Sequence, residues 1–187
     1  MAAKPKVFVS FVTVLLFSSR SDTSTPLPLT TTLPPTGTHQ SLLVTLDASG
    51  GKGGVSVTPT SIPEGYFSAT IKVRLLGAKP NTTYYIQRAP EIGRALGSDG
   101  VCQRALGLSP WSSADAAAPA FVPFVVSNTT TPITVATAST GDASLDFDFR
   151  AATIPAGTHF DVMFRLLDDP ALPTSIYISG CFTVTVL

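Results

Sequence analysis

The chain is poor in charge, in histidine and in cysteine, and each shortage narrows what it can do. Only 13% of its 187 residues are charged, and 12 Lys and Arg balance 12 Asp and Glu, so the formal net charge is zero. The basic residues form no run or stripe, which removes the electrostatic case for a nucleic-acid partner. The two histidines, His39 and His159, are far apart in the sequence. A zinc site needs clustered ligands, so we expect no zinc and no cofactor.

Motifs of catalysis are missing as well. His159 and Asp161 lie two residues apart on an expected strand without a nucleophile elbow, which does not support a Ser-His-Asp arrangement. No glycine-rich phosphate loop precedes a helix. The sequence therefore predicts a protein that is not an enzyme, with a hydrolase as the most distant alternative.

Six aspartates in the second half of the chain raise the question of a calcium site. Calcium takes several oxygen ligands from closely placed groups, but the spacing here matches no calcium loop. We interpret these residues as turn residues and as solvated, outward positions of strands. The outward positions are Asp146, Asp148 and Asp161; the others are Asp142, Asp168 and Asp169.

No apolar run is long enough to span a membrane as a helix. Val7–Phe17 is broken only by Ser10 and Thr13, and it follows two lysines. This pattern predicts an export signal over residues 1–19, and hence an extracellular or cell-surface protein without a stable transmembrane span. The alternative is a buried N-terminal strand, because Val and Phe also favour strands.

Threonine and proline dominate the next segment, residues 20–41. Proline blocks helix formation and ladder hydrogen bonds, so we expect an extended linker. Residues 42–187 remain as one domain of moderate size.

That domain is dominated by an alternation of apolar and polar residues with a period of two. Such a pattern is typical of antiparallel strands with one buried and one solvated face. Many short strands separated by Gly, Pro and Asn turns predict an all-β, antiparallel β-sandwich. The pattern predicts buried Phe147, Phe149, Phe160, Val162, Phe164, Val184 and Val186, and exposed Asp146, Asp148, Arg165 and Thr185. Further strands are expected at 42–47, 55–58, 67–75, 83–89, 121–127, 133–138 and 175–179.

Two stretches carry a proline, then a threonine, then an aromatic residue that enters a strand. In the first of them, Pro80-Asn81-Thr82-Thr83-Tyr84 resembles the corner that enters the sixth strand of fibronectin type III domains. The match departs at its first position, where Ala78 stands for Leu, and it covers about seven residues. The resemblance implies an immunoglobulin-like sandwich in which the Tyr84 hydroxyl bonds to nearby backbone, and it implies nothing about function.

Two cysteines interrupt this pattern. Cys102 lies in a Gly/Ala-rich excursion, Pro90–Pro119, and Cys181 opens the last expected strand. An even pair in an exported chain predicts a disulfide, and two unrelated thiols are the alternative. Because the residues that alternate with Cys181 are apolar, we expect Cys181 to face outward. The bridge would then clamp the loop to the outer face or rim of a sheet.

The loop is the candidate binding surface. It carries Arg94, Arg104 and Trp111, residue types that are enriched at binding hot spots. The alternative is a structural flap in which Trp111 fills a gap beside the sandwich. Leu96, Leu106 and Leu108 are expected to pack under the loop in either case.

These observations leave two hypotheses for function. The first is a non-catalytic binding or adhesion module that uses the loop to hold a protein or glycan partner at a surface. The second is a structural subunit that pairs with copies of itself by strand addition at an open sheet edge. The glycosylation sequons at Asn81 and Asn128 do not discriminate between them, because chance accounts for both in a Thr-rich chain.

Overall fold

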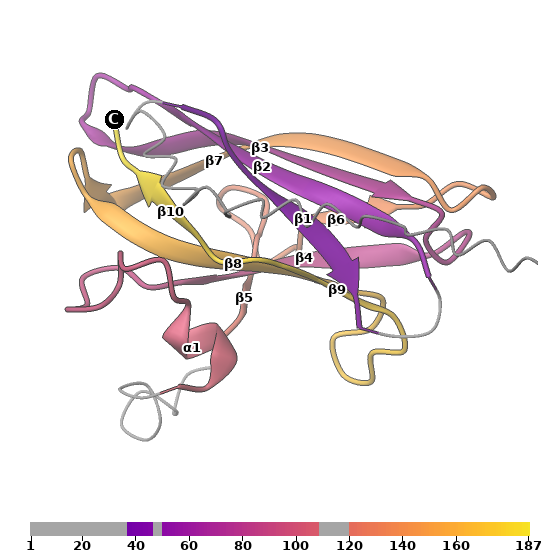
Figure 1. Cartoon of the computed structure of the whole chain (residues 1–187). Helices are drawn as coiled ribbons and strands as arrows, with labels where there is room; N and C mark the ends of the chain where they lie inside the picture. The colour runs from indigo at the N-terminus through magenta and orange to yellow at the C-terminus, as the bar shows by residue number, and fades with distance from the viewer. Residues whose placement is uncertain (1–36, 47–49, 109–119) are drawn as a thin grey trace, which may run out of the picture. The chain divides into compact units, whose positions relative to one another are not determined.

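The computed structural model describes residues 37–46, 50–108 and 120–187, which belong to one compact unit, Leu33–Leu187 (Figure 1). The expected signal peptide, most of the expected linker and Trp111 lie outside the described residues. The first strand begins at His39, three residues before the expected strand. The elements are β1 (His39–Thr45), β2 (Lys52–Thr60), β3 (Tyr66–Leu76), β4 (Thr83–Pro90), α1 (Gln103–Leu106), β5 (Val122–Pro123), β6 (Thr134–Ala136), β7 (Ala143–Pro155), β8 (His159–Leu167), β9 (Ile176–Ser179) and β10 (Phe182–Thr185).

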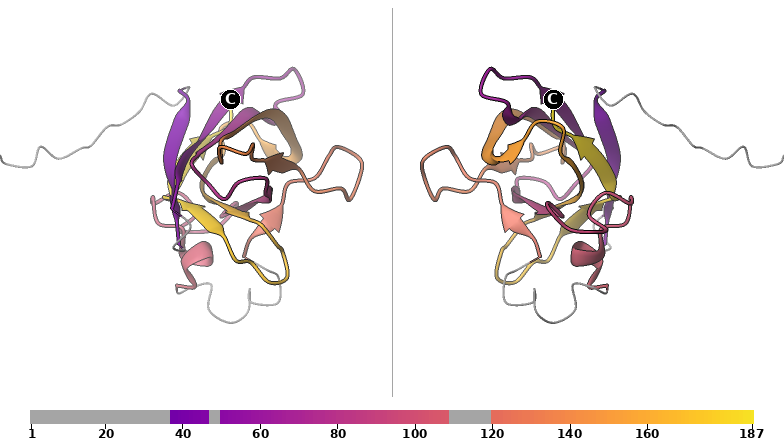
Figure 2. Two further views of the ribbon diagram at one scale, coloured as in Figure 1. Left: turned by 90° about the vertical axis from the view of Figure 1, so that its right-hand side faces the viewer. Right: turned by 90° about the vertical axis from the view of Figure 1, so that its left-hand side faces the viewer.

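All ten strands belong to one antiparallel sheet. Its main path runs β5-β4-β8-β9-β1-β2-β3-β7, with β10 paired to β8 and β6 paired to β4. Figure 2 shows the strands curving around a common interior. The all-β, antiparallel prediction is confirmed. A division into two separate sheets, as in an immunoglobulin-like sandwich, is not confirmed, because β9 and β1 are hydrogen-bonded and join the two halves.

The inner face of the sheet forms the main core, as the alternation predicts. On β3, Phe67, Ala69, Ile71, Val73 and Leu75 are buried in turn. The predicted inner residues of the last strands are also buried: Phe160, Val162, Phe164, Val184 and Val186.

On β7 the alternation is present but shallower. Phe147 and Phe149 are half-buried and pack against the core, whereas Asp146 and Asp148 are exposed as predicted. Across the outer face, Asp146 accepts a hydrogen bond from Arg74 at 2.7 Å, and Asp148 accepts one from the Thr70 hydroxyl at 2.8 Å. β7 therefore shows a polar outer face while its aromatic rings cover the edge of the core.

A shift of one residue separates β9 from β10. Arg165 of β8 lies opposite Ile178 of β9, whereas Val162 of β8 lies opposite Phe182 of β10. The chain from β9 to β10 therefore has one residue more than the part of β8 that it faces. An extra residue exchanges the two faces, which lets Tyr177 and Val184 both point to the core. The Ser179 hydroxyl accepts a hydrogen bond from the Phe164 N–H at 2.8 Å and so occupies the interrupted ladder.

Arg165 of β8 and Thr185 of β10 were predicted to be exposed, and both predictions are wrong. Arg165 is half-buried because Phe121 covers it, with the guanidinium carbon 4.3 Å from the ring centroid. Thr185 is half-buried and shares a 2.9 Å hydrogen bond with Nδ1 of His159. The strand expected at 121–127 is shorter than predicted and is ordered as β5 only over Val122–Pro123.

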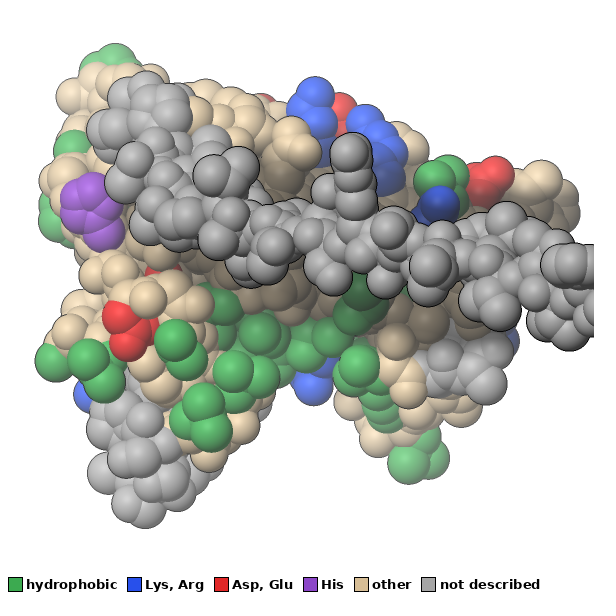
Figure 3. Space-filling model, in the orientation of Figure 1, with side chains coloured by type: hydrophobic (Ala, Val, Ile, Leu, Met, Phe, Trp, Pro, Cys, Tyr) green, Lys and Arg blue, Asp and Glu red, His purple; other side chains and the backbone are tan. Residues whose placement is uncertain are grey.

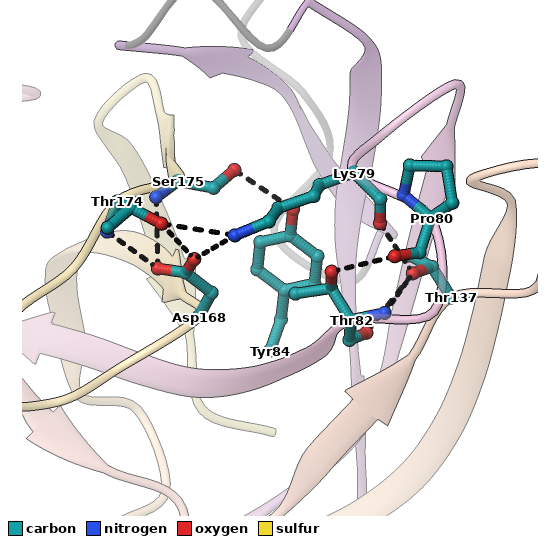
Figure 4. Close-up of polar contacts among 8 residues, drawn as sticks. All are labelled: Lys79, Pro80, Thr82, Tyr84, Thr137, Asp168, Thr174 and Ser175. Carbon is teal, nitrogen blue, oxygen red and sulfur yellow. Dashed lines mark hydrogen bonds and ion pairs between the residues drawn. The ribbon is translucent and has the colours of Figure 1, made fainter.

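The connection from β3 to β4 crosses between the two halves of the sheet, and polar contacts hold it in place (Figure 4). Asp168 accepts hydrogen bonds from Lys79 Nζ at 3.1 Å, from the Thr174 hydroxyl and N–H, and from the Ser175 N–H. Burial alone would raise the pKa of Asp168, but these donors outweigh burial and hold its pKa well below the usual range. The crossing is therefore tied to the β8–β9 turn by a charged acceptor.

The partner predicted for Tyr84 is wrong. Its hydroxyl hydrogen-bonds to the Ser175 hydroxyl at 2.9 Å, 91 residues away, and not to upstream backbone. The backbone near Pro80 is held instead by Thr137, whose hydroxyl donates to the Lys79 carbonyl and accepts from the Thr82 N–H. Tyr84 is fully buried against the ring of Tyr177, so the hydroxyl bond joins two parts of the core.

Replacing Tyr84 by Phe should lower the free energy of unfolding by about 1–2 kcal/mol, because it leaves the buried Ser175 hydroxyl without this partner while keeping the ring. Urea denaturation measures the change. The matched control is Tyr66→Phe, since Tyr66 is exposed and should change stability little. Equal unfolding midpoints for wild type and Tyr84→Phe would show that Tyr84 acts through ring packing alone.

Candidate functional site

The predicted disulfide between Cys102 and Cys181 is confirmed, with the two Cα atoms 5.5 Å apart. It holds the loop Glu91–Leu108 against the outer face of β4 and β8. Backbone hydrogen bonds also join the loop to β8. The Glu91 N–H donates to the Asp161 carbonyl, and the Asp161 N–H donates to the Gly97 carbonyl. We call this surface, made of the loop and the outer side of β4, β8 and β9, the loop face.

Asp161 corrects the expectation that it is a solvated outward residue. It does point outward from β8, but the loop covers it completely. One carboxylate oxygen accepts from the Gly100 N–H at 2.7 Å and the other from the Thr183 hydroxyl at 2.5 Å. A buried carboxylate that receives hydrogen bonds from the loop and from β10 fixes the position of both.

A second buried carboxylate, Glu91, has no signal in the sequence. Its Oε1 accepts from the backbone N–H of Arg104 at 2.6 Å, which ties the start of the loop to α1. Asp99 adds a local link, since it accepts from the Val101 N–H and from the Gln103 amide. Burial raises the pKa of Glu91, and the neighbouring Asp161 and Asp99 raise it further, whereas the Arg104 N–H opposes them.

Close packing at Gly97 also fixes the loop. A Cβ atom at this position would lie 2.0 Å from the Glu91 carbonyl oxygen, so only glycine fits. The loop is thus held by a covalent bond, two buried carboxylates and one backbone contact that allows no side chain.

Beneath the loop lies a second, smaller hydrophobic cluster. Ala89, Cys102, Phe121 and Met163 form it, and Ala105, Ile178 and Cys181 pack around it. Next to it, Arg165 stacks on Phe121 and donates two hydrogen bonds to Gln87 Oε1, at 3.1 and 2.5 Å. Among the described residues, no carboxylate forms an ion pair with Arg165, and burial lowers the pKa of its guanidinium.

The leucines of the loop do not pack under it as expected. Leu96, Leu106 and Leu108 are 47%, 51% and 45% exposed. Figure 3 shows hydrophobic side chains gathered over α1 and β8, on a face that is hollowed between the loop and the β8–β9 connection. The small residues Ala105 and Cys102 make the packed contacts instead, which leaves the larger side chains at the surface.

The structure describes two of the three residues that the sequence predicts to bind a partner, and these two differ in their surroundings. Arg94 is exposed, and Arg104 is half-buried beside Glu91, with its backbone bonded to that carboxylate. Trp111 lies outside the described residues. The residues that the prediction missed are Arg165, Gln87 and Phe121, which come from strands or their ends and carry no local signal.

Other classes of site have no support in the part of the chain that the structure describes. No group of three or more His, Cys, Asp or Glu residues is placed to hold a metal ion there. Asn81 and Asn128 are exposed and have left-handed backbone angles, φ 50° and 61°, a conformation that asparagine adopts more readily than most residues. Turn geometry therefore accounts for the presence of asparagine at both positions.

Comparison of the chain with protein-family profiles, with curated proteins and with solved structures found no match. Within the described residues, no helix has both the length and the apolar character needed to cross a membrane.

Removing the disulfide with a Cys102→Ala, Cys181→Ala double variant should lower the free energy of unfolding by about 4.5 kcal/mol, the chain-entropy value for a loop of 79 residues. Urea denaturation measures this loss, and hydrogen exchange should show faster exchange first at the Gly97 to Leu108 amides. A loss below about 1 kcal/mol would show that the buried carboxylates alone hold the loop.

The raised pKa of Glu91 predicts a dependence of stability on pH. A carboxyl that ionises less readily in the folded state binds more protons there, so unfolding free energy falls as pH rises from about 4.3 through the folded pKa. Glu91→Gln keeps an acceptor for the Arg104 N–H and should lack this fall, so its stability relative to wild type should increase between pH 4 and 7. Glu64→Gln, at an exposed turn, is the control; parallel curves for Glu91→Gln and wild type would contradict the assignment.

Proposed function

We propose that this protein is an exported, non-catalytic binding module, and that the loop face is its recognition surface for a protein partner. The observation that carries the proposal is the combination of a rigidly held loop with large apolar side chains left exposed on it. Exposed apolar side chains favour association with a partner. When the loop that carries them is rigid, little conformational entropy is lost on binding.

The chemistry of the loop face supports a protein partner. Leu106 and Leu108 offer apolar contact area, and the Arg165 guanidinium beside Phe121 offers donors at the edge of the same cluster. Arginine, aromatic and apolar groups together are typical of the centres of protein interfaces. The disulfide supports an oxidising, extracellular location, since such bonds persist there and are rare in the cytosol.

A second candidate function is assembly by strand addition, favoured by one observation. β7 has 13 residues and, among the described strands, is hydrogen-bonded to β3 alone, so one long edge is open to a further strand. The outer face of β7 carries Asp146 and Asp148, whose charge discourages unspecific pairing.

An immunoglobulin-like arrangement remains part of the proposal for the fold. Its support is that the connections β3–β4 and β7–β8 both cross between the two halves of the sheet, as connections do between the layers of a sandwich. Such kinship would be compatible with a binding or adhesion role without specifying it.

The test compares a Leu106→Asp, Leu108→Asp variant with wild type. Labelled full-length protein is titrated onto intact cells of the producing organism and onto their extracellular material. We expect at least tenfold weaker binding by the variant, because each Asp would be desolvated in an apolar contact. Leu172→Asp, a leucine of the β8–β9 connection that is 78% exposed, is the control and should bind as wild type does.

Two outcomes would reject the loop face. Unchanged binding by the Leu106, Leu108 variant, with the fold intact by circular dichroism, would show that the partner contacts another surface. Concentration-dependent self-association by light scattering, unaffected by the loop variant but abolished by a proline in β7, would support assembly by strand addition instead.

A further inference from the structure

A mostly buried arginine lies on the inner face of the sheet, on the opposite side from the loop face. Arg88 of β4 shares a face with the buried Tyr84 and Ile86, so its side chain enters the core region. Its guanidinium carbon lies 4.5 Å from the centroid of Phe124 and 4.4 Å from that of Phe149. Phe124 follows β5 and Phe149 belongs to β7, so Arg88 stands where the two ends of the curved sheet approach one another.

The charge of Arg88 has no carboxylate partner among the described residues. One nitrogen, Nη1, donates to the Pro123 carbonyl at 3.3 Å, and no other hydrogen bond joins the guanidinium to the described residues. Burial lowers the pKa of Arg88 to about 10. Buried charges in proteins are usually paired, so an arginine placed here with unused donors is a candidate anion site.

Arg88 also lines a cavity of about 40 Å³ in which every other lining side chain is apolar. This exceeds the roughly 10–15 Å³ that a single water needs, yet apolar walls hold water poorly. The residues that line the cavity come mainly from β2, β3, β4, β7, β8 and β10. Its walls include Ile92, Phe149, Ile154, Phe160 and Val162.

We propose that Arg88 and this cavity bind a monocarboxylate with a short apolar chain. The carboxylate would take the unused donors of the guanidinium, whose planar fork matches a carboxylate in two hydrogen bonds. The first carbons of the chain would enter the cavity. A single negative charge neutralises the single positive charge, and the small volume limits the buried part of the chain to a few atoms.

The geometry favours this class over a bare inorganic anion. An inorganic ion would use the arginine but leave the apolar cavity beside it empty. A neutral alcohol would use the cavity but leave the guanidinium unpaired. Only a ligand with both parts uses the whole site, and this difference makes the proposal testable with simple probes.

The experiment titrates the full-length protein with butanoate, acetate, inorganic phosphate and butan-1-ol at constant ionic strength, with binding followed by calorimetry and by thermal unfolding. We expect butanoate to bind and to raise the unfolding temperature, and to bind at least tenfold more tightly than acetate, phosphate or butan-1-ol. Arg88→Met keeps an unbranched apolar side chain and should bind butanoate at least tenfold more weakly. Arg150→Met, an exposed arginine of β7, is the matched control and should bind as wild type does.

A measurement on wild type keeps the proposal testable if Arg88→Met does not fold. In ¹⁵N spectra, butanoate should shift the Nε–H resonance of Arg88, and butan-1-ol should not. Equal responses to butanoate and phosphate would reject the carboxylate class. The site itself would be rejected if Arg88→Met bound butanoate as wild type does, or if the Arg88 resonance did not move.

Discussion

The sheet must enclose one main core although, in the described part of the chain, its two ends are not hydrogen-bonded to each other, and much of the structure follows from that constraint. Among the described strands, β5 and β7 are the two ends of the main path of the sheet, and no ladder of hydrogen bonds joins them. Side chains close the interior there. The ring centroid of Phe124 lies 5.2 Å from those of Phe147 and Phe149, and Arg88 packs over the rings of Phe124 and Phe149. Aromatic and cation–π contacts thus take the place of backbone pairing.

β8 is covered on both faces, so outward side chains are buried as well as inward ones. Its inner side chains, such as Phe164 and Leu166, belong to the main core, while Asp161 and Met163 lie under the loop. The loop can cover that outer face only because the disulfide, Asp161 and Glu91 hold it there. The one-residue shift before β10 brings Cys181 to the outer side, where it meets Cys102.

The sequence predicted the inner face and the disulfide but not the outer face of β4 and β8. The alternation of Phe160, Val162 and Phe164 is a local pattern, and it locates the core correctly. The environments of Asp161 and Arg165 depend on residues distant in the chain, such as Gly100, 61 residues from Asp161, and Gln87, 78 residues from Arg165. Alternation treats every outward position as solvated. Glu91 has the same difficulty, because its partner Arg104 is known only after the loop is placed, whereas the partner of Gln87 depends on the register of β4 with β8.

Both candidate sites depend on the same pairing of β4 with β8. Gln87 lies opposite Arg165 on the outer face, and the next residue, Arg88, lies opposite Phe164 on the inner face. A slip of β8 by one residue would bring Arg165 into the core, and a slip of β4 by one residue would place Arg88 under the loop. The fully buried side chains of Tyr84, Ile86 and Leu166 oppose such a slip, because each would lose its place in the core. The register that encloses the core therefore also decides which arginine faces the loop and which faces the cavity.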